Sequence, residues 1–410
     1  MLRSFLSSEN GNFAAIFAVA MVPVMASVAG VVDFASTANK AAKLQNSLDT
    51  AALAIATQYY SGMTHDALQD LGETYFASNM LSGMTAEGKD FSLSDETEAF
   101  EISASEEGQL NFISVSSRIT HDGFLGGDSL WHATRRSYVR IAPGPKSCVL
   151  ALDEDASAAI KIQGSAQVAF DGCVIASNSD AADAVSRGGT ATISADCVSA
   201  VGGTEGVATS YSDLDCSKPL ENQYPSFNPL ANVPLPAYGA CASMPGGPTK
   251  TLTPGTFCNK TWSGDITLEP GVYILKGGKI QLGGNDSLIG HGVTIFLMED
   301  ATFTTNGNEY IELSPPSSGP YAGITVYQAP GNTQTLTING SAGSTVEGFI
   351  YAPSAHVIYA GTSTMSGAGS CIRIIANTIE FNGTSAVASD CEGVLGGREI
   401  YASREISLVR

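Results

Sequence analysis

The segment Phe13–Val32, FAAIFAVAMVPVMASVAGVV, contains no charged residue over twenty positions near the start of the chain. An α-helix rises 1.5 Å per residue, so twenty residues span about 30 Å, the thickness of a bilayer's hydrocarbon core. No second run of this kind follows in the polar, glycine-rich remainder. The sequence therefore predicts one transmembrane helix at 13–32 that carries a large domain on one side of a membrane.

A cleaved signal peptide and a buried core helix are the alternatives for this segment. Its apolar run is longer than the roughly 7–15 residues of a signal-peptide core, and an amphipathic helix follows without a turn. That helix is predicted over Ser36–Tyr60, which contains no Gly or Pro. Residues at i, i+4, i+7, i+8, i+11 and i+15 form its apolar stripe: Leu44, Leu48, Ala51, Ala52, Ile55 and Tyr59. We expect anchor and amphipathic helix to form one rod, within a first domain at 1–60.

Charge beside the apolar run does not orient the anchor. Arg3 and Glu9 precede the run, while Lys40 and Lys43 follow it, so the positive-inside rule is nearly undecided. Net charge restricts the partners more clearly. Forty acidic residues against twenty basic ones give −20, which disfavours nucleic acid and anionic lipid. With 44 glycines and only 15% charged residues, the composition indicates repetitive β structure in an outward-facing protein.

The cysteines give a firmer indication of compartment. All eight lie beyond residue 140, and none forms a C-x-x-C pair, which argues against a zinc or redox centre. Four disulfides formed in an oxidising compartment are therefore predicted, and buried reduced thiols in a cytosolic chain are the alternative. We therefore expect a single-pass chain whose large domain lies on the periplasmic or extracellular side of its membrane. Spacing close to one repeat favours the pairs Cys148–Cys173, Cys197–Cys216, Cys241–Cys258 and Cys371–Cys391.

A small α+β, pilin-like module is predicted over 61–145. His65–Met80 has helical spacing, and three later stretches alternate apolar and polar residues as strands do. These stretches are Phe100–Ser105, Leu110–Ser116 and Ser137–Ile141.

Short β-runs that end in glycine recur through the carboxy-terminal part of the chain, at Gly164, Gly189, Gly284, Gly307, Gly340, Gly361 and Gly383. Within the first pair and along the later series the spacing is close to one repeat, except for a longer interval from Gly307 to Gly340. A period of about 20–25 residues with several short strands per turn predicts a right-handed β-helix, that is, a disulfide-stapled β-solenoid over 146–395. A β-sandwich is the alternative. The glycines would form tight corners with positive φ.

Two segments interrupt this pattern. Pro315, Pro316 and Pro320 lie in the longer interval and indicate a loop inserted in one coil. Lys218–Pro254 contains eight prolines, and we expect it to pack on the surface of the solenoid rather than to act as a flexible linker. Residues 396–410 are expected to form a carboxy-terminal tail.

The first fifty residues resemble the amino-terminal segment of TadG-type proteins of the Flp (tight adherence) pilus system. The resembling features are Glu9-Asn10-Gly11-Asn12, Pro23 inside the apolar run, Asp33 at its end, and Leu44-Gln45-x-x-Leu48-Asp49-x-Ala51-Ala52. The resemblance implies a long amino-terminal helix anchored in the inner membrane. It also implies a part in pilus assembly or surface attachment, with other pilus-system proteins as partners and no known chemistry.

Some members of that family carry a von Willebrand A domain with an Asp-x-Ser-x-Ser metal site. Here Asp153 could begin such a motif, but Asp155 stands in place of the first Ser, ahead of Ser157. No alternating helix–strand pattern follows. A strand that ends in an acidic turn is the better interpretation.

Gly127-Asp128-Ser129-Leu130 spells the GDSL motif of a lipase family, and Gly283-Gly284-Asn285-Asp286 fits that family's later G-x-N-D block. A nucleophilic serine needs a histidine and an orienting carboxylate, which that family supplies from D-x-x-H. None of His65, His121, His132, His291 and His356 has an Asp three residues earlier. We therefore interpret the match as coincidence.

A β-solenoid also suggests enzymes that cleave polysaccharides with clustered carboxylates and Arg or Lys. The candidates are few: Asp286, Glu299, Asp300, Glu309, Glu312, Glu347, Arg373, Glu380 and Asp390. A single imperfect calcium-type nonapeptide around Asp286 cannot build a site that needs stacked turns. We expect no catalytic, metal or cofactor-binding residue and no enzyme activity. The predicted function is a non-catalytic envelope component of Flp/Tad-type pilus assembly or adhesion. The alternative is a membrane-tethered β-helix that binds or cleaves polysaccharide, with a surface glycan as its partner.

Overall fold

The computed structural model describes residues 12–59, 65–81, 97–107, 110–120, 132–305, 307–340, 343–361, 371–387, 391 and 393–409. The chain divides into two compact units. Unit 1 comprises Met1–Ala142 with Glu405–Arg410, and unit 2 comprises Pro143–Arg404. The fold is mainly β with one long apolar helix at the amino-terminal end, as the sequence predicts.

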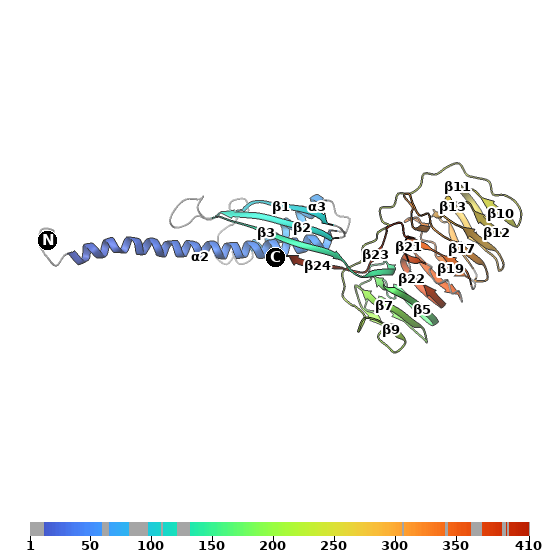
Figure 1. The fold of residues 1–410 in the computed structure, drawn as a ribbon, viewed down its shortest axis with the longest axis horizontal. Helices are drawn as coiled ribbons and strands as arrows, with labels where there is room; N and C mark the ends of the chain where they lie inside the picture. Colours follow the sequence, from blue (N-terminus) through green and yellow to red (C-terminus); the bar gives the residue numbers. More distant parts are fainter. Residues whose placement is uncertain are drawn as a thin grey trace. The chain divides into compact units, whose positions relative to one another are not determined.

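Unit 1 combines two helices with a four-stranded sheet (Figure 1). The elements are α2 (Asn12–Gln58), α3 (His65–Leu81), β1 (Thr97–Glu107), β2 (Leu110–Thr120), β3 (His132–Pro143) and β24 (Arg404–Val409). The sheet order is β1-β2-β3-β24, with β1 and β3 antiparallel to β2. The predicted helix at 65–80 and the three predicted strands are confirmed. The expected tail differs, because its last residues form β24 at the edge of this sheet.

The amphipathic stripe of α2 forms the core of unit 1. Leu44 and Leu48 are fully buried, and Ala51, Ala52 and Ile55 are at most 1% exposed. They pack with the apolar residues of α3 and of the sheet, including Phe76, Val115 and Val139. The stripe predicted from helical spacing is therefore confirmed, and its partners are the inward face of the sheet and α3.

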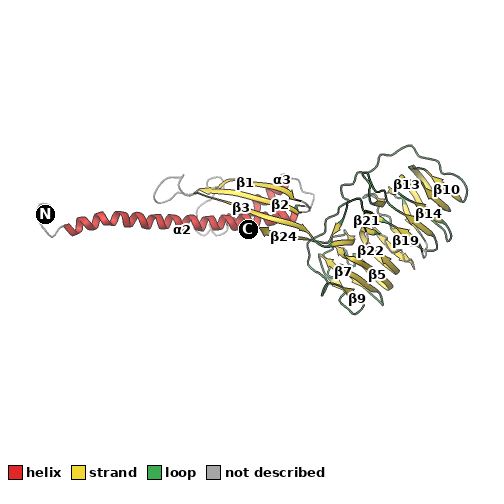
Figure 2. Cartoon of the chain, in the orientation of Figure 1, coloured by secondary structure: helices red, strands yellow, loops and turns green. Residues whose placement is uncertain are grey.

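Unit 2 is built from short strands, shown as stacked yellow arrows joined by green loops in Figure 2. The strands are β4 (Lys146–Ala151), β5 (Ile160–Ser177), β6 (Val185–Arg187), β7 (Thr192–Ala200), β8 (Thr204–Glu205), β9 (Ser212–Leu214), β10 (Thr249–Leu252), β11 (Gly255–Trp262), β12 (Asp265–Leu268), β13 (Gly271–Gln281), β14 (Ser287–Gly290), β15 (Val293–Met298), β16 (Thr302–Thr304), β17 (Tyr310–Leu313), β18 (Ile324–Gln328), β19 (Leu336–Gly340), β20 (Thr345–Val346), β21 (Gly348–Gly361), β22 (Ile372–Val387) and β23 (Ile400–Tyr401). Among the strand pairs of unit 2 that the structure describes, only β23–β4 is antiparallel.

Most parallel neighbours in unit 2 are about one sequence repeat apart. Tyr273 of β13 pairs with Ile295 of β15, and Ile350 of β21 pairs with Ile374 of β22. Between β15 and β18 the offset is longer, because Ile295 pairs with Val326. The inserted loop with its three prolines accounts for the longer offset, as predicted. For most pairs the sequence period is thus the separation between hydrogen-bonded neighbours.

Long strands join two faces of the stack. The first half of β13 pairs with β15 and its second half with β16, while β21 pairs in the same way with β18 and β19. The pairings β18-β15-β13-β16-β19-β21 therefore close into a ring. A separate sheet has the order β10-β12-β14-β17-β20.

The chain enters the stack in its middle rather than at an end. β22, the last long strand in sequence, pairs with β4 through Ile374 and Val149, and with β5 through Ile379 and Ile160. Green β5 and red-orange β22 accordingly lie side by side in Figure 1. In the order of pairing, the strands run from 249 to 387 and then from 146 to 220. We call the junction between β22 and β4–β5 the seam.

The proline-rich segment 218–254 connects the two ends of this stack and lies on its surface. Ser226 and Asn178 exchange two hydrogen bonds of 2.7 and 3.0 Å, and the Asn228 amide donates to the Tyr351 hydroxyl at 3.1 Å. Leu230 is fully buried beside the apolar residues of the neighbouring strands. The predicted packed excursion is therefore confirmed.

The glycine corners are confirmed in part. Gly164 and Gly189 have φ values of 71° and 66°, and a side chain at Gly189 would come within 2.7 Å of the Gly164 carbonyl oxygen. Gly307 also has positive φ, at 97°, whereas Gly284 does not. Both stacked corners thus favour glycine for the left-handed backbone, and at Gly189 the close approach of the neighbouring strand also excludes a side chain.

Candidate functional site

The first half of α2 exposes an apolar surface on all sides. Its large apolar side chains are between 38% and 74% exposed, although the second half of the same helix is packed against the sheet. These side chains belong to Ile16, Phe17, Val19, Met21, Val22, Val24, Met25, Val28, Val31 and Val32. By length and composition this helix can cross a membrane. An apolar surface of this size needs an apolar phase around it, and a helix satisfies its backbone hydrogen bonds internally there.

The helix continues through Pro23, one of the features on which the family resemblance rests. Asp33, which ends the apolar run, is buried at 3% exposure. The packed stripe begins at Ala41, so the exposed apolar residues and the residues packed in unit 1 occupy consecutive stretches of one helix.

Four disulfides tie neighbouring segments of unit 2 together. The pairs are Cys148–Cys173, Cys197–Cys216, Cys241–Cys258 and Cys371–Cys391, with Cα–Cα distances of 5.6, 5.4, 5.5 and 4.8 Å. These are the pairs that the spacing favours. Cys241–Cys258 fastens the proline-rich segment to β11, so the far end of the stack is held covalently.

Disulfide formation predicts a chemical result for the purified protein. We expect none of the eight cysteines to react with an alkylating reagent before reduction, and all eight to react after reduction and unfolding. Mass spectrometry of the intact chain and of its unreduced peptides measures both the count and the pairs. Eight alkylated thiols in the unreduced, denatured chain would contradict the expected oxidising compartment.

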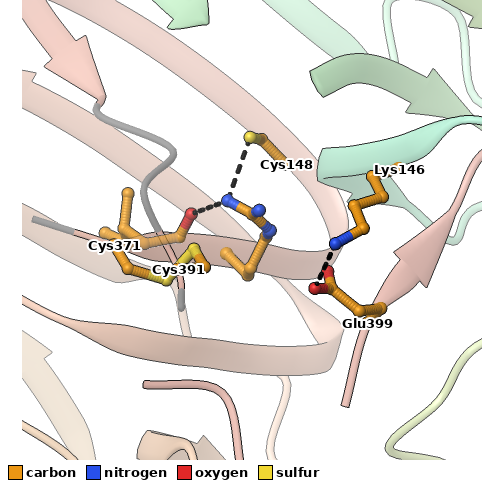
Figure 3. A network of polar contacts seen from close by, with 7 residues as sticks. Lys146, Cys148, Cys371, Cys391 and Glu399 are labelled. Atoms are coloured by element: carbon orange, nitrogen blue, oxygen red, sulfur yellow. Dashed lines mark hydrogen bonds and ion pairs between the residues drawn. A yellow bond between two sulfur atoms is a disulfide. The ribbon is translucent and has the colours of Figure 1, made fainter. Parts of the chain in front are cut away.

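The seam buries an arginine. Arg373 on β22 is 2% exposed, and its Nη1 donates to the Cys148 Sγ and to the Ile372 carbonyl oxygen, each at 3.1 Å. Burial lowers the pKa of Arg373, although the negative charge of Glu399 acts in the opposite direction. Figure 3 marks the hydrogen bond to Cys148 with a dashed line and also draws the Cys371–Cys391 disulfide and the ion pair of Lys146 with Glu399, whose Nζ–Oε1 distance is 2.9 Å. Arg373 therefore links the last coil to the first rather than facing a solvent groove.

Asp153 also lies at the seam. One carboxylate oxygen accepts the backbone N–H groups of Asp155 at 3.1 Å and Ala156 at 2.8 Å, and the other accepts Asn377 Nδ2 at 2.8 Å. Partial burial raises the pKa of Asp153, but these hydrogen bonds outweigh it and hold the pKa below its ordinary value of 3.8. The acidic turn predicted after β4 is thus confirmed, with the carboxylate closing the turn and contacting the neighbouring coil.

Replacing Asp153 by Ala should lower the free energy of unfolding of unit 2 by about 1–3 kcal/mol at pH 7, since three donors lose their acceptor. A depressed pKa stabilises the fold above the unfolded-state value of about 3.9. That contribution disappears as the pH falls through the lower folded-state value. Urea unfolding should therefore show a wild-type advantage that shrinks below about pH 4. Asp180→Ala, at an exposed carboxylate, is the control and should show neither effect.

Two of the acidic candidates for polysaccharide cleavage have structural roles. Glu299 pairs with Lys276, with an N–O distance of 3.2 Å. One Asp286 oxygen accepts the N–H groups of Gly264 and Gly283, each at 2.8 Å, and so closes a turn onto the preceding coil.

Glu380 belongs to a network across the seam. It accepts hydrogen bonds from Gln163 and Asn382 at 2.7 and 2.6 Å, and it lies 3.8 Å from the His356 Nε2. The Lys161 Nζ lies 4.0 Å from the same carboxylate oxygen, Oε2, that His356 approaches. Because these partners come from β5, β21 and β22, the carboxylate joins three neighbouring strands.

A carboxylate on β17 approaches His291, which follows the end of β14. Glu312 accepts the Tyr310 hydroxyl at 2.7 Å and lies 3.5 Å from the His291 Nε2. The pKa of Glu347 is raised, chiefly because the carboxyl group is partly buried. The charge of Glu312 also raises this pKa, whereas His291 acts in the opposite direction. The remaining acidic candidates stand apart: Glu309 is buried and accepts the Gly307 N–H, Asp300 is exposed, and Asp390 lies outside the described residues.

Several motifs singled out in the sequence cannot be placed. The whole GDSL motif with Ser129, and also His121, lie outside the described residues. Within the part of the chain that the structure describes, no three His, Cys, Asp or Glu side chains gather as metal ligands would. Sequence reasoning missed the seam contacts altogether, since Arg373 and Cys148 are 225 residues apart and no local pattern connects them.

The comparisons with known proteins bear on the amino-terminal helix. Residues 11–58 match the family model described as "Putative Flp pilus-assembly TadE/G-like". No curated protein and no solved structure matches the chain. The matched residues cover both the lipid-compatible half of α2 and the stripe that packs in unit 1. Residues 11–58 are therefore similar to the TadE/G-like segment that this model describes, as their resemblance indicated.

Proposed function

We propose that unit 2 is a β-solenoid whose chain order is shifted, so that its first coil stacks on its last. Support comes from parallel neighbours that are mostly one sequence repeat apart. The alternation of buried and outward residues along β7, β12 and β17 also supports it. The ring of six pairings follows from two long strands that each bend around a corner, since β13 and β21 each pair with two successive neighbours on the same side.

We further propose that this protein is a non-catalytic component of the cell envelope in a Flp/Tad-type pilus system. It would act there by holding its domains next to other envelope proteins and contacting them, without converting a substrate. The observation that carries the proposal is the coincidence of residues 11–58, the TadE/G-like segment, with a helix that is apolar and exposed first and packed second. Such a helix can hold unit 1 at the membrane surface and seat an outward head beside other pilus proteins.

The proposed location is the inner membrane, with the large carboxy-terminal part on the periplasmic or extracellular side. Four disulfides support this orientation, because structural disulfides persist in oxidising compartments. The partners would be other pilus-system proteins that contact the amino-terminal helix, within the membrane or near its surface.

Deletion of the gene in the source bacterium tests this function. We expect reduced pilus-dependent surface attachment, restored by the wild-type chain. The Leu44→Ala/Leu48→Ala chain should fail to restore attachment, because both side chains are fully buried in the core of unit 1. Normal piliation and attachment in the deletion strain, together with a glycan-degrading defect, would instead favour the polysaccharide-cleaving alternative.

Two substitutions test whether the protein has catalytic activity. Ser129→Ala should leave any esterase activity of the purified protein unchanged. The Glu299→Gln chain, expressed in the deletion strain, should restore surface attachment as well as the wild-type chain does. Glu299 pairs with Lys276 at the surface, where an exposed ion pair contributes little to stability. Stoichiometric labelling of Ser129 by a serine-directed probe would contradict the non-catalytic proposal.

A further inference from the structure

A hollow of about 630 Å³ opens on the outer face of β5, β7 and β9. The ladder places Ala169 beside Ser194 and Ser194 beside Asp213, so small side chains form the middle of this face. The intervening residues Val168 and Ile193 are buried in the core of unit 2. The small side chains of this row leave a depression in the outer face. Its volume lies in the range of ligand pockets.

Polar side chains with free hydrogen-bonding capacity border the hollow. Among the described residues, none of the following side chains forms a hydrogen bond with the chain: Gln167, Thr192, Ser194, Ser210 and Asp213. Other outer faces of unit 2 differ, since Ser287 bonds to Asp265 at 2.9 Å and Tyr310 bonds to Glu312 at 2.7 Å. The hollow therefore presents hydroxyl, amide and carboxylate groups that the fold itself does not use.

An aromatic ring is held at the edge of the hollow. Tyr211 lines it and is 48% exposed, and the Arg187 guanidinium lies 4.9 Å from the ring centroid. Arg187 is itself fixed, because it donates to the Gly206 and Ala191 carbonyl oxygens at 2.6 and 2.9 Å. A cation–π contact of this kind keeps an exposed ring in place. Tyr211 is thus a positioned apolar surface next to polar groups.

We propose that this hollow binds an uncharged oligosaccharide, with one sugar ring packed against Tyr211. A pyranose has an apolar C–H face and a rim of hydroxyl groups, which correspond to an aromatic ring beside Ser, Thr, Gln and Asp side chains. A tyrosine ring combines an apolar face with a polar edge. An acidic sugar fits poorly, because Asp213 is the one charged residue among the described residues of the lining, and the nearby Arg187 already donates to two carbonyl oxygens and lies against the Tyr211 ring. The chain also has a net charge of −20. This binding site is additional to the proposed place in a pilus system and does not depend on it.

Calorimetric titration of the full chain tests the site. The protein is held in phosphatidylcholine nanodiscs, because glycoside detergents would compete for the hollow. The probes are maltotriose, the trimer of N-acetylglucosamine and, as the acidic comparison, the trimer of galacturonic acid. We expect saturable binding of at least one uncharged trimer with a Kd below about 1 mM. Tyr211→Ala should weaken it at least about tenfold, and Ser194→Leu should abolish it by filling the floor.

Tyr238→Ala is the matched control. Tyr238 is 51% exposed and its ring also lies near a cation, with Lys276 Nζ 5.2 Å from the centroid, but it does not line the hollow. The Tyr238→Ala chain should bind the uncharged trimers with the same affinity as the wild-type chain. Absence of binding by both uncharged trimers would overturn the proposal. Equal affinity in folded Tyr211→Ala and Ser194→Leu chains, or tighter binding of the acidic trimer, would also overturn it. Attachment by the bacterium is not a readout here, so failure of this site leaves the pilus proposal untouched.

Discussion

Replacing Val22 and Val24 together by Arg should remove the protein from the membrane fraction. These side chains are 68% and 56% exposed in the apolar half of α2, where lipid would surround them. Each arginine near the centre of a membrane helix costs about 2.5–3.5 kcal/mol on insertion scales. Two together cost about 5–7 kcal/mol, enough to shift partitioning by roughly four-thousandfold to a hundred-thousandfold. Flotation and carbonate extraction of the full-length chain measure the effect.

Ala42→Arg with Asn46→Arg is the matched control on the same helix. Both positions are exposed and lie beyond the apolar run, among residues whose other face packs in unit 1. The control chain should therefore remain with the membrane. Recovery of the full-length wild-type protein in the soluble fraction would contradict the membrane anchor, whatever the variants do.

Replacing Leu44 and Leu48 together by Ala should unfold unit 1. Both residues are fully buried against the apolar residues of α3 and the sheet. A buried Leu→Ala change costs about 2–5 kcal/mol, because apolar contacts are lost and a cavity remains. The pair thus approaches the whole stability of a small domain, about 5–15 kcal/mol. Hydrogen exchange of the full chain in nanodiscs should show lost protection in α3 and β1–β3, with unit 2 protected as before.

Tyr138→Ala provides the comparison, because it also removes a large side chain from unit 1 but at a position that is 42% exposed. Little apolar area is lost there, so we expect protection close to that of the wild type. Wild-type protection of α3 in the Leu44→Ala/Leu48→Ala chain would show that the stripe does not hold unit 1 together.

Features that depend on neighbours in sequence were predictable. The uncharged run in the first half of α2, the helical spacing from Leu44 to Ile55 and the alternation in β2 and β3 are local patterns, and local patterns report which face of an element is apolar. Cysteine pairs could be inferred for a similar reason, since each partner lies between 17 and 25 positions away, about one coil. The same holds for the TadE/G-like segment, whose motifs are contiguous.

The tertiary structure alone decided which segments meet over long distances. A repeat period predicts which residues point inward. Every repeat, however, offers strands with a similar unpaired edge, so the period does not predict which two repeats pair with each other. Packing made the last coil the neighbour of the first, with Arg373 buried against Cys148. It also returned β24 to the sheet of unit 1 and brought Ser194, Tyr211 and Asp213 around one hollow. Contacts of this kind depend on the summed energy of non-local strand pairing, which has no signature in any single stretch of sequence.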